Sequence, residues 1–206
     1  MLKIHTLTLG DYQTNTYIVH DAAATTCCII DPGYEADTIL RHVAQLGLTV
    51  DAILLTHGHF DHVGAVERIV AQTHCRLWMH EGDWSQFPNP VNACFYPLTN
   101  CDFTEVDLME DGGIIHAGGT EFRAISTPGH TRGSVCLLCG DALFSGDTLF
   151  AGSCGRTDLP GGDAGTLAQS LARLAQLEGD FRVYPGHGGA TTLLREKKNN
   201  PYMPRP

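Results

Sequence analysis

Positively charged residues are scarce in this sequence. Of its 206 residues only 13 are Lys or Arg, against 23 Asp or Glu, which gives a formal net charge of -10. A surface that binds nucleic acid needs clustered Lys and Arg to neutralise phosphates. The composition therefore argues against nucleic acid as a partner. The chain has three lysines, and two of them belong to a short basic cluster formed by Arg195, Lys197 and Lys198.

Long apolar runs are also lacking. No stretch of about 18 apolar residues is present, so we predict no transmembrane helix and no membrane partner. The first 13 residues read as a short strand and lack the apolar core of a signal peptide. We therefore expect a cytoplasmic protein. No low-complexity tract divides the chain, and its length suits a single domain over residues 1–206.

Zinc-ribbon cysteine patterns are absent, although the chain has eight cysteines. Such a ribbon needs two C-x-x-C pairs on turns. The one such pair, Cys136 and Cys139, lies in an apolar stretch that reads as a strand, where an odd spacing points the side chains to opposite faces. We predict buried, reduced thiols. A redox role for the adjacent Cys27 and Cys28 is the alternative.

Predicted strands alternate with predicted helices along the chain. Apolar patterning predicts helices over 35–46, 62–73, 164–177 and from 190. It predicts strands at 2–8, 15–20, 26–31, 52–55, 76–80, 114–116, 120–127, 134–139, 142–146 and 181–184. The Pro- and Asn-rich segment 82–104 reads as a long surface loop or lid, and 152–162 as a Gly-rich loop. This alternation indicates a layered α/β fold.

Four of these strands end in a glycine followed by a histidine or an aspartate. The pairs are Gly58-His59, Gly129-His130, Gly146-Asp147 and Gly186-His187. Glycine lets the backbone turn sharply where a strand ends. Side chains at strand ends meet at the mouth of a sheet, where α/β proteins place their sites. The pattern therefore predicts one site built from all four strand ends.

The densest group of candidate ligands is the segment from His57 to His62. His57 and His59 project to the same side of an extended chain, and Asp61 and His62 follow as the chain turns into a helix. Imidazole and carboxylate together suit zinc, iron or manganese. We predict a metal centre, because burying these groups unpaired would be costly. The other histidines are interpreted as surface or core residues without partners: His5, His20, His42, His74, His80 and His116.

These motifs resemble the metallo-β-lactamase superfamily. Its H-x-H-x-D-H signature matches residues 57–62, and the segments 127–131 (TPGHT), 145–148 (SGDT) and 185–188 (PGHG) match its other elements. The resemblance implies a four-layer αββα sandwich and two divalent metal ions, with zinc expected and iron or manganese as alternatives. It also implies that His57, His59 and His130 bind the first ion and that Asp61, His62 and His187 bind the second. Asp147 would then bridge the two ions.

Within the superfamily the chain looks like the short bacterial forms of glyoxalase II. β-Lactamases usually carry Cys where this chain has Asp147, and they lack a histidine at the position of His62. The implied activity is hydrolysis of a small acyl thioester such as S-lactoylglutathione through a metal-bridging hydroxide. Asp61 would be both a ligand and the catalytic group that orients the nucleophile. A thiolate leaves readily, so no separate general acid is needed.

Two other functions remain open at this point. Persulfide dioxygenases share the fold but use one iron held by two His and one Asp, and their sequence resembles residues 152–158 here. The segment Pro185-Gly186-His187 favours the hydrolase, because the dioxygenases carry Ala in place of this Gly. A binding protein with a relic metal site is the second alternative. The presence of all seven ligands argues against it.

Several further residues are assigned by position. Asp31 either holds the metal loop in place or is a turn residue. Arg156 either contacts substrate carboxylates or forms an ion pair with Asp158 or Asp163. Tyr184 is expected to pack in the core. Arg195, Lys197 and Lys198 are further candidates for substrate contact. The expected partner is a small thioester, and the expected state is a monomer or small homo-oligomer.

Overall fold

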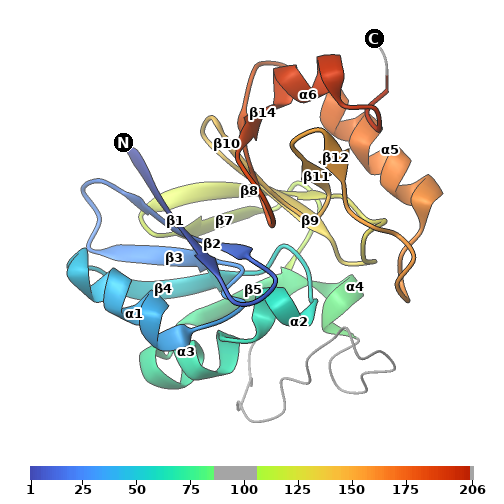
Figure 1. Cartoon of the computed structure of the whole chain (residues 1–206). Helices are drawn as coiled ribbons and strands as arrows, with labels where there is room; N and C mark the ends of the chain where they lie inside the picture. Colours follow the sequence, from blue (N-terminus) through green and yellow to red (C-terminus); the bar gives the residue numbers. More distant parts are fainter. Residues whose placement is uncertain (86–105, 205–206) are drawn as a thin grey trace.

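The computed structural model describes residues 1–85 and 106–204, and it contains two stacked sheets of six strands each (Figure 1). Strands of the first sheet follow chain order: β1 (Leu2–Leu9), β2 (Thr14–Asp21), β3 (Thr26–Ile30), β4 (Thr49–Leu54), β5 (Arg76–His80) and β6 (Val106–Met109). β1, β2 and β3 are antiparallel, whereas β3 to β6 run parallel.

The second sheet has the strand order β14-β13-β10-β9-β8-β7. Its strands are β7 (Ile114–Ala117), β8 (Thr120–Ser126), β9 (Val135–Cys139), β10 (Ala142–Gly146), β13 (Arg182–Pro185) and β14 (Thr191–Thr192). β10 is antiparallel to β9, β9 is antiparallel to β8, and β13 is parallel to β10. The carboxyl ends of β8, β10 and β13 therefore lie at the same edge. A small hairpin of β11 (Leu149–Phe150) and β12 (Ser153–Cys154) follows β10.

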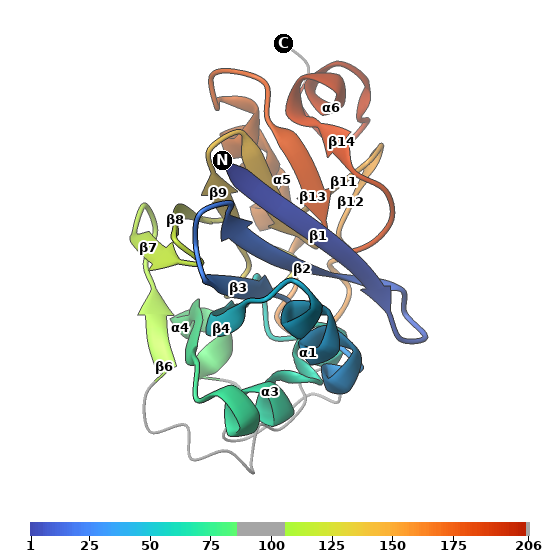
Figure 2. The same ribbon diagram turned by 90° about the vertical axis from the view of Figure 1, so that its left-hand side faces the viewer.

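Helices cover the outer face of each sheet (Figures 1 and 2). α1 (Ala36–Gln45) and α3 (Val66–Thr73) lie on the first sheet, and α5 (Ala164–Ala175) and α6 (Leu193–Asn199) lie on the second. Two single-turn helices, α2 (Phe60–Val63) and α4 (Glu81–Trp84), connect strands. None of the described helices combines the length and the apolar character needed to cross a membrane.

Three apolar clusters correspond to the three interfaces between these layers. Along β2, Ile18 packs toward α1 and α3, while its neighbour Val19 packs between the sheets. On β9, Leu137 lies between the sheets, while Cys136 packs toward α5 and α6. Neighbouring side chains of a strand point to opposite faces, so strands buried on both faces form the two inner layers. The predicted four-layer αββα sandwich is confirmed.

The cysteines of the described residues form no disulfide bond. Cys136 and Cys139 face different apolar clusters, as their odd spacing predicted, and Cys27 and Cys28 do the same. Burial raises the pKa of all four thiols. Raised pKa values disfavour the reactive thiolate. The predicted burial of these four thiols is confirmed.

Four predicted segments differ from the structure. The helix expected from 190 begins at Leu193, because Thr191 and Thr192 pair with β13 as strand β14. The helix expected over 62–73 is broken into α2 and α3 at Gly64 and Ala65, where the backbone N of Ala65 donates to the carbonyl oxygen of Pro32 at 2.9 Å and not to a helical carbonyl. The loop expected over 82–104 starts inside helix α4, and residues 86–105 lie outside the described residues. The loop expected over 152–162 includes strand β12.

Candidate metal centre

All the predicted ligands lie where strands end. His57 and His59 follow β4, His130 follows β8, Asp147 follows β10, and His187 follows β13. Asp61 and His62 belong to α2, which begins directly after His59. The two sheets thus bring side chains separated by up to 130 residues to one edge of the sandwich.

The first group of ligands is fully buried. His57, His59 and His130 have ring nitrogens within 4.8 Å of one another. His130 Nε2 lies 2.9 Å from His59 Nδ1. Three imidazoles that converge in this way match the protein ligands of a His₃ zinc site.

The second group lies beside the first and is formed by Asp61, His62 and His187. His187 Nε2 is 3.2 Å from Asp61 Oδ2, and His62 Nε2 is 3.6 Å from the same oxygen. His62 is completely buried, whereas His187 is 27% exposed in its side chain and lies at the surface of a pocket.

Asp147 lies between the two groups. Its Oδ1 is 3.4 Å from His62 Nε2, and its Oδ2 is 3.7 Å from His130 Nε2 and 3.5 Å from His187 Nε2. One carboxylate therefore faces ligands of both groups. If each group held one metal ion, this carboxylate would be placed to contact both.

Backbone carbonyls fix the orientation of two imidazoles. His130 Nδ1 donates to the carbonyl oxygen of Arg156 at 2.8 Å, and His187 Nδ1 donates to that of Tyr12 at 3.0 Å. Since a carbonyl oxygen can only accept, Nδ1 carries the proton in both rings. The Nε2 lone pair of each ring is then directed into the centre, as in metal-binding histidines.

Asp31 performs the same task for His62 and the loop before His57. His62 Nδ1 donates to Asp31 Oδ2 at 3.0 Å, and Thr56 donates through its backbone N to Oδ1 and through its hydroxyl to Oδ2. The nitrogens of His57 and His62 and a carboxylate oxygen of Asp31 also lie within 4.8 Å of one another. Because both Asp31 oxygens already accept from protein donors, we assign it a positioning role and not a ligand role.

Asp83 is a buried aspartate of the centre that sequence reasoning missed. It accepts from Gly58 N and the Thr131 hydroxyl through Oδ2, and from Gly133 N through Oδ1, each at 2.8 Å. It thereby connects α4 to the loop that carries His57 and His59 and to the loop that carries His130. Its position at the start of a predicted surface loop concealed this role, and burial raises the pKa of its carboxyl.

Asn15 was also missed, and it holds the His187 loop against the β1–β2 hairpin. Its side-chain amide donates to the carbonyl oxygens of Pro185 and Gly188 at 3.0 and 2.8 Å. Its backbone N donates to Gly186 O at 2.8 Å. These contacts join residues at least 170 positions apart, and no local sequence signal predicts them.

Gly186 shows why a glycine precedes a ligand here. A Cβ at this position would lie 2.2 Å from Asp147 Oδ1 and 2.7 Å from His62 Cε1. Any side chain at this position would displace the carboxylate of Asp147 and the imidazole of His62. The glycine is therefore required by close packing around the centre.

The electrostatics differ between the two groups. Burial lowers the pKa of His59 to about 3 and holds that of His57 well below its usual value, so both imidazoles are neutral, which is the ligand form. Burial also opposes charge on His62, but Asp147, Asp31 and Asp61 outweigh it and raise the pKa of His62 to about 9. The second group thus concentrates negative charge where a cation would bind.

Unsatisfied buried atoms test whether metal ions fit this centre. Within the described residues, His57 Nε2 and Asp147 Oδ1 are buried and have no hydrogen-bond partner. Such atoms cost free energy unless they have a partner. A divalent cation bound by each group supplies that partner, and nitrogen and oxygen donors of this kind suit such ions. The donor set therefore fits divalent metal ions.

The centre opens into a cavity of about 520 Å³. Its walls include Tyr12, Phe60, Phe150 and Leu159, and Arg156 is its one cationic residue other than histidine among the described lining residues. Arg156 forms a two-point ion pair with Asp158 at 2.7 and 2.8 Å.

The C-terminal cations are not among the cavity-lining residues. Arg195, Lys197 and Lys198 lie on α6, and Lys197 Nζ donates to the carbonyl oxygen of Leu177. Their predicted substrate contact therefore finds no support in their placement. Tyr184 packs against Tyr17 and Phe144 in the core, as predicted.

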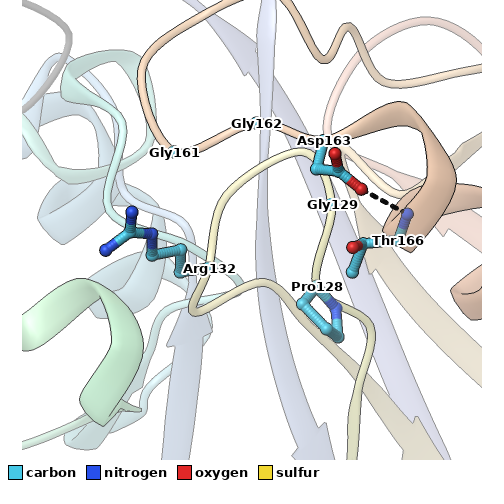
Figure 3. Close-up of a pocket in the computed structure, with 7 residues that line it drawn as sticks. All are labelled: Pro128, Gly129, Arg132, Gly161, Gly162, Asp163 and Thr166. Atoms are coloured by element: carbon cyan, nitrogen blue, oxygen red, sulfur yellow. Dashed lines mark hydrogen bonds between the residues drawn. The ribbon is translucent and has the colours of Figure 1, made fainter.

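A smaller cavity of about 280 Å³ lies behind the His130 loop, between Pro128, Gly129, Arg132 and the start of α5 (Figure 3). Asp163 caps α5 by accepting from Thr166 N at 2.7 Å, and its own backbone N donates to Gly129 O at 2.8 Å. Asp163 thus anchors the chain before His130, and Asp158 is the partner of Arg156.

Comparisons with known proteins agree with this geometry. The hydroxyacylglutathione hydrolase GloC of Haemophilus influenzae is 34% identical to this chain, and the match covers 98% of each chain. The probable metallo-hydrolase YqgX of Bacillus subtilis has the same identity and the same coverage. The solved structure of TTHA1623 in a di-iron-bound form is 37% identical, has a TM-score of 0.84, and is matched over 97% of this chain and 100% of its own.

A second solved structure, the B3 metallo-β-lactamase BLEG-1, is 32% identical with a TM-score of 0.83, over 98% of this chain and 99% of its own. The family model of the metallo-β-lactamase superfamily matches residues 9–187, which include every residue of the two ligand groups and Asp147. This chain is a member of the metallo-β-lactamase superfamily.

Proposed function

We propose that this protein hydrolyses small acyl thioesters, such as S-lactoylglutathione, at a centre of two divalent metal ions, with zinc as the expected metal. The observation that carries the proposal is the placement of Asp147 between two complete ligand groups. A relative at 34% identity that is named a hydroxyacylglutathione hydrolase supports the substrate class.

The residues present fit the requirements of such a reaction. Two bound ions supply a water of lowered pKa and a positive charge for the oxyanion. Asp61 Oδ2 lies 3.2 Å from His187 Nε2 and 3.4 Å from the Thr14 hydroxyl, at the boundary between the centre and the cavity. Its carboxylate is placed to accept a hydrogen bond from the attacking water and so to orient it toward a carbonyl carbon.

Among the described residues that line the cavity, none is placed as a general acid for the leaving group. Apart from the ligands, the described lining residues that carry a titratable group are Tyr12, Cys154 and Arg156. An amide or ester needs a proton at its leaving atom more than a thioester does, because a thiolate has a pKa near 8.5 and departs unaided. The lining therefore favours a thioester over substrates with poorer leaving groups.

Two alternatives have a specific observation behind them. The similarity to BLEG-1 makes β-lactam hydrolysis the first. The segment 152–158, which resembles persulfide dioxygenases, makes oxygenation at one iron the second. The similarity to a structure in a di-iron-bound form favours a centre with two ions over the dioxygenase, and it makes iron the main alternative to zinc.

The test combines metal analysis with three activity assays on one preparation. We expect close to two metal ions per chain, and hydrolysis of S-lactoylglutathione that is lost on chelation and restored by Zn²⁺. A chromogenic cephalosporin and glutathione persulfide should be turned over far more slowly. A preparation that holds one iron, binds no second ion and consumes oxygen with the persulfide would reject the proposal in favour of the dioxygenase.

A further inference from the structure

Three histidines that are distant from one another in the sequence form a cluster far from the metal centre. His5 lies on β1, His20 on β2 and His42 on α1, and all three are half-buried. The sequence predicted isolated surface or core residues, and the fold instead brings them together. Strand β2 runs from the metal centre, where Asn15 lies, to His20, about 17 Å further along at about 3.4 Å per residue.

The His5 and His20 rings face each other through one nitrogen each. Their Nε2 atoms are 3.3 Å apart, the ring planes are within 4° of parallel, and the ring centres are 5.5 Å apart. Since the nitrogens are far closer than the ring centres, the rings meet through their Nε2 edges. Two ligand nitrogens of a tetrahedral zinc ion are separated by about 3.3–3.4 Å, given Zn–N bonds of about 2.0–2.1 Å.

A backbone contact fixes His20 in the tautomer that a metal needs. His20 Nδ1 lies 2.9 Å from the carbonyl oxygen of Asp21, which can only accept, so Nδ1 carries the proton. The Nε2 lone pair of the neutral ring is then directed toward His5. A hydrogen bond from Nδ1 to a backbone carbonyl is the usual support of a metal-binding histidine.

His42 supplies a third imidazole beside the pair. Its ring centre lies 5.6 Å from that of His5, with the planes at 63°. Its Nε2 is buried and has no hydrogen-bond partner among the described residues. A polar atom buried in this way loses its interaction with water without replacement. No ion pair in the described part of the chain joins a carboxylate to any of the three side chains.

We propose that His5 and His20, with His42 as a third ligand after rotation of its ring, bind a late first-row divalent cation such as Zn²⁺ outside the catalytic centre. On binding, the proton of His5 moves from Nε2 to Nδ1, so that both Nε2 atoms coordinate the ion. The cation would join β1, β2 and α1. Because it would bind the folded chain and not the unfolded chain, it would stabilise the amino-terminal part of the first sheet.

The experiment measures Zn²⁺ stoichiometry by equilibrium dialysis of protein whose catalytic centre is already loaded with Zn²⁺. We compare wild type with His20→Gln and with a matched control, His116→Gln, an exposed histidine on β7. We expect wild type and the control to bind one Zn²⁺ more than His20→Gln, or to bind it at least tenfold more tightly. Thioester hydrolysis should be equal in all three proteins.

A second variant and a second measurement protect the result against misfolding. His5→Gln should lose the same ion. In the metal-free state, both variants should have the same circular dichroism spectrum and the same Tm as wild type. Added Zn²⁺ should raise the Tm of loaded wild type and leave that of the two variants unchanged. Equal stoichiometry together with equal affinity in wild type and His20→Gln overturns the proposal, whichever substrate the catalytic centre uses.

Discussion

Asp147 is the side chain that faces both ligand groups, and its removal should therefore affect both metal ions. We expect Asp147→Ala to lower kcat/KM at least about tenfold more than His57→Ala, which removes one ligand of one group. Metal analysis should show both ions reduced in Asp147→Ala and mainly one in His57→Ala. Asp141→Ala, which removes only an exposed ion pair with Arg182, is the control.

Kinetics of metal-reloaded variants decide the outcome. If Asp147→Ala keeps most of its activity while His57→Ala abolishes it, Asp147 does not bridge the ions, despite its distances of 3.4 to 3.7 Å from three histidines.

Asp31 acts through His62 and Thr56, so its replacement should weaken metal binding without removing a ligand. Asp31→Asn keeps only one of the two acceptor oxygens, so either His62 Nδ1 or the backbone N of Thr56 loses its partner, and changes of this kind reduce metal affinity by about 10–100-fold. Competition with a chromogenic chelator measures the affinity, and Asp37→Asn, at an exposed ion pair with Arg68, is the control. An unchanged affinity in Asp31→Asn would show that Asp31 is only a turn residue.

The proton on His62 makes metal binding depend on pH. The pKa of His62 is raised to about 9 in the metal-free protein, so the imidazole is protonated at pH 7. An ion that binds Nε2 must displace that proton, and metal affinity should rise by about tenfold per pH unit up to pH 9. Calorimetry at pH 7 in buffers of different ionisation enthalpy should show release of at least one proton per second-group ion. Zero release would contradict the pKa assignment.

At the scale of elements, the predicted strands and helices largely match, because apolar side chains repeat with the period of each element. The strand at 134–139 and the helix at 164–177 are examples, observed as β9 and α5. The elements that the sequence did not predict are short. β6 and the β11–β12 hairpin are short, and α4 is a single turn, so none carries a periodic signal long enough to detect.

The seven predicted ligands are all brought to one edge of the sandwich, because each stands next to a turn at a strand end. The residues that position them were harder to predict. Asp83 and Asn15 act through hydrogen bonds to backbone groups far away in the sequence, and a single sequence has no signal for such pairings. Asp31 was an open alternative, and its three hydrogen bonds assign it to the metal loop.

Helix α4 should be essential for the first ligand group because Asp83 ties it to the loops of His57, His59 and His130. Asp83→Ala leaves two backbone N–H groups and one hydroxyl without their acceptor. Each lost partner costs about 1–3 kcal/mol, so we expect the free energy of unfolding to fall by more than about 2 kcal/mol. Urea denaturation measures this loss, with exposed Glu110→Ala as the control. Equal stability of the two variants would contradict a tethering role.

At the scale of the whole molecule, the protein carries a negative net charge, and its candidate metal centre is rich in histidine. The formal net charge is -10, and the cavity has Arg156 as its one cation other than histidine among the described lining residues. Arg156 is already paired with Asp158, and the basic residues of α6 do not line the cavity. Long-range attraction of an anionic substrate is therefore weak, and recognition must come from the centre and the apolar wall.

This arrangement predicts weak selection for the thiol portion of the substrate. Glutathione carries two carboxylates, and each exposed charge pair contributes about 0–1 kcal/mol. Binding that is equal in the ground state and the transition state affects KM more than the chemical step. We therefore expect S-lactoylglutathione to be hydrolysed with a high KM, and thioesters of smaller thiols to be accepted as well.

The decisive measurement is kcat/KM for glutathione thioesters against thioesters of a smaller thiol with the same acyl group. Arg156→Gln serves as an internal probe, since it removes the one non-histidine cation that the described residues place at the cavity. We expect a ratio well under 100-fold, and less than a tenfold change in Arg156→Gln. A preference above about 100-fold corresponds to about 2.7 kcal/mol of specific recognition. Such a preference would require carboxylate contacts beyond those of the described cavity, and the weakly selective pocket inferred from its lining would be wrong.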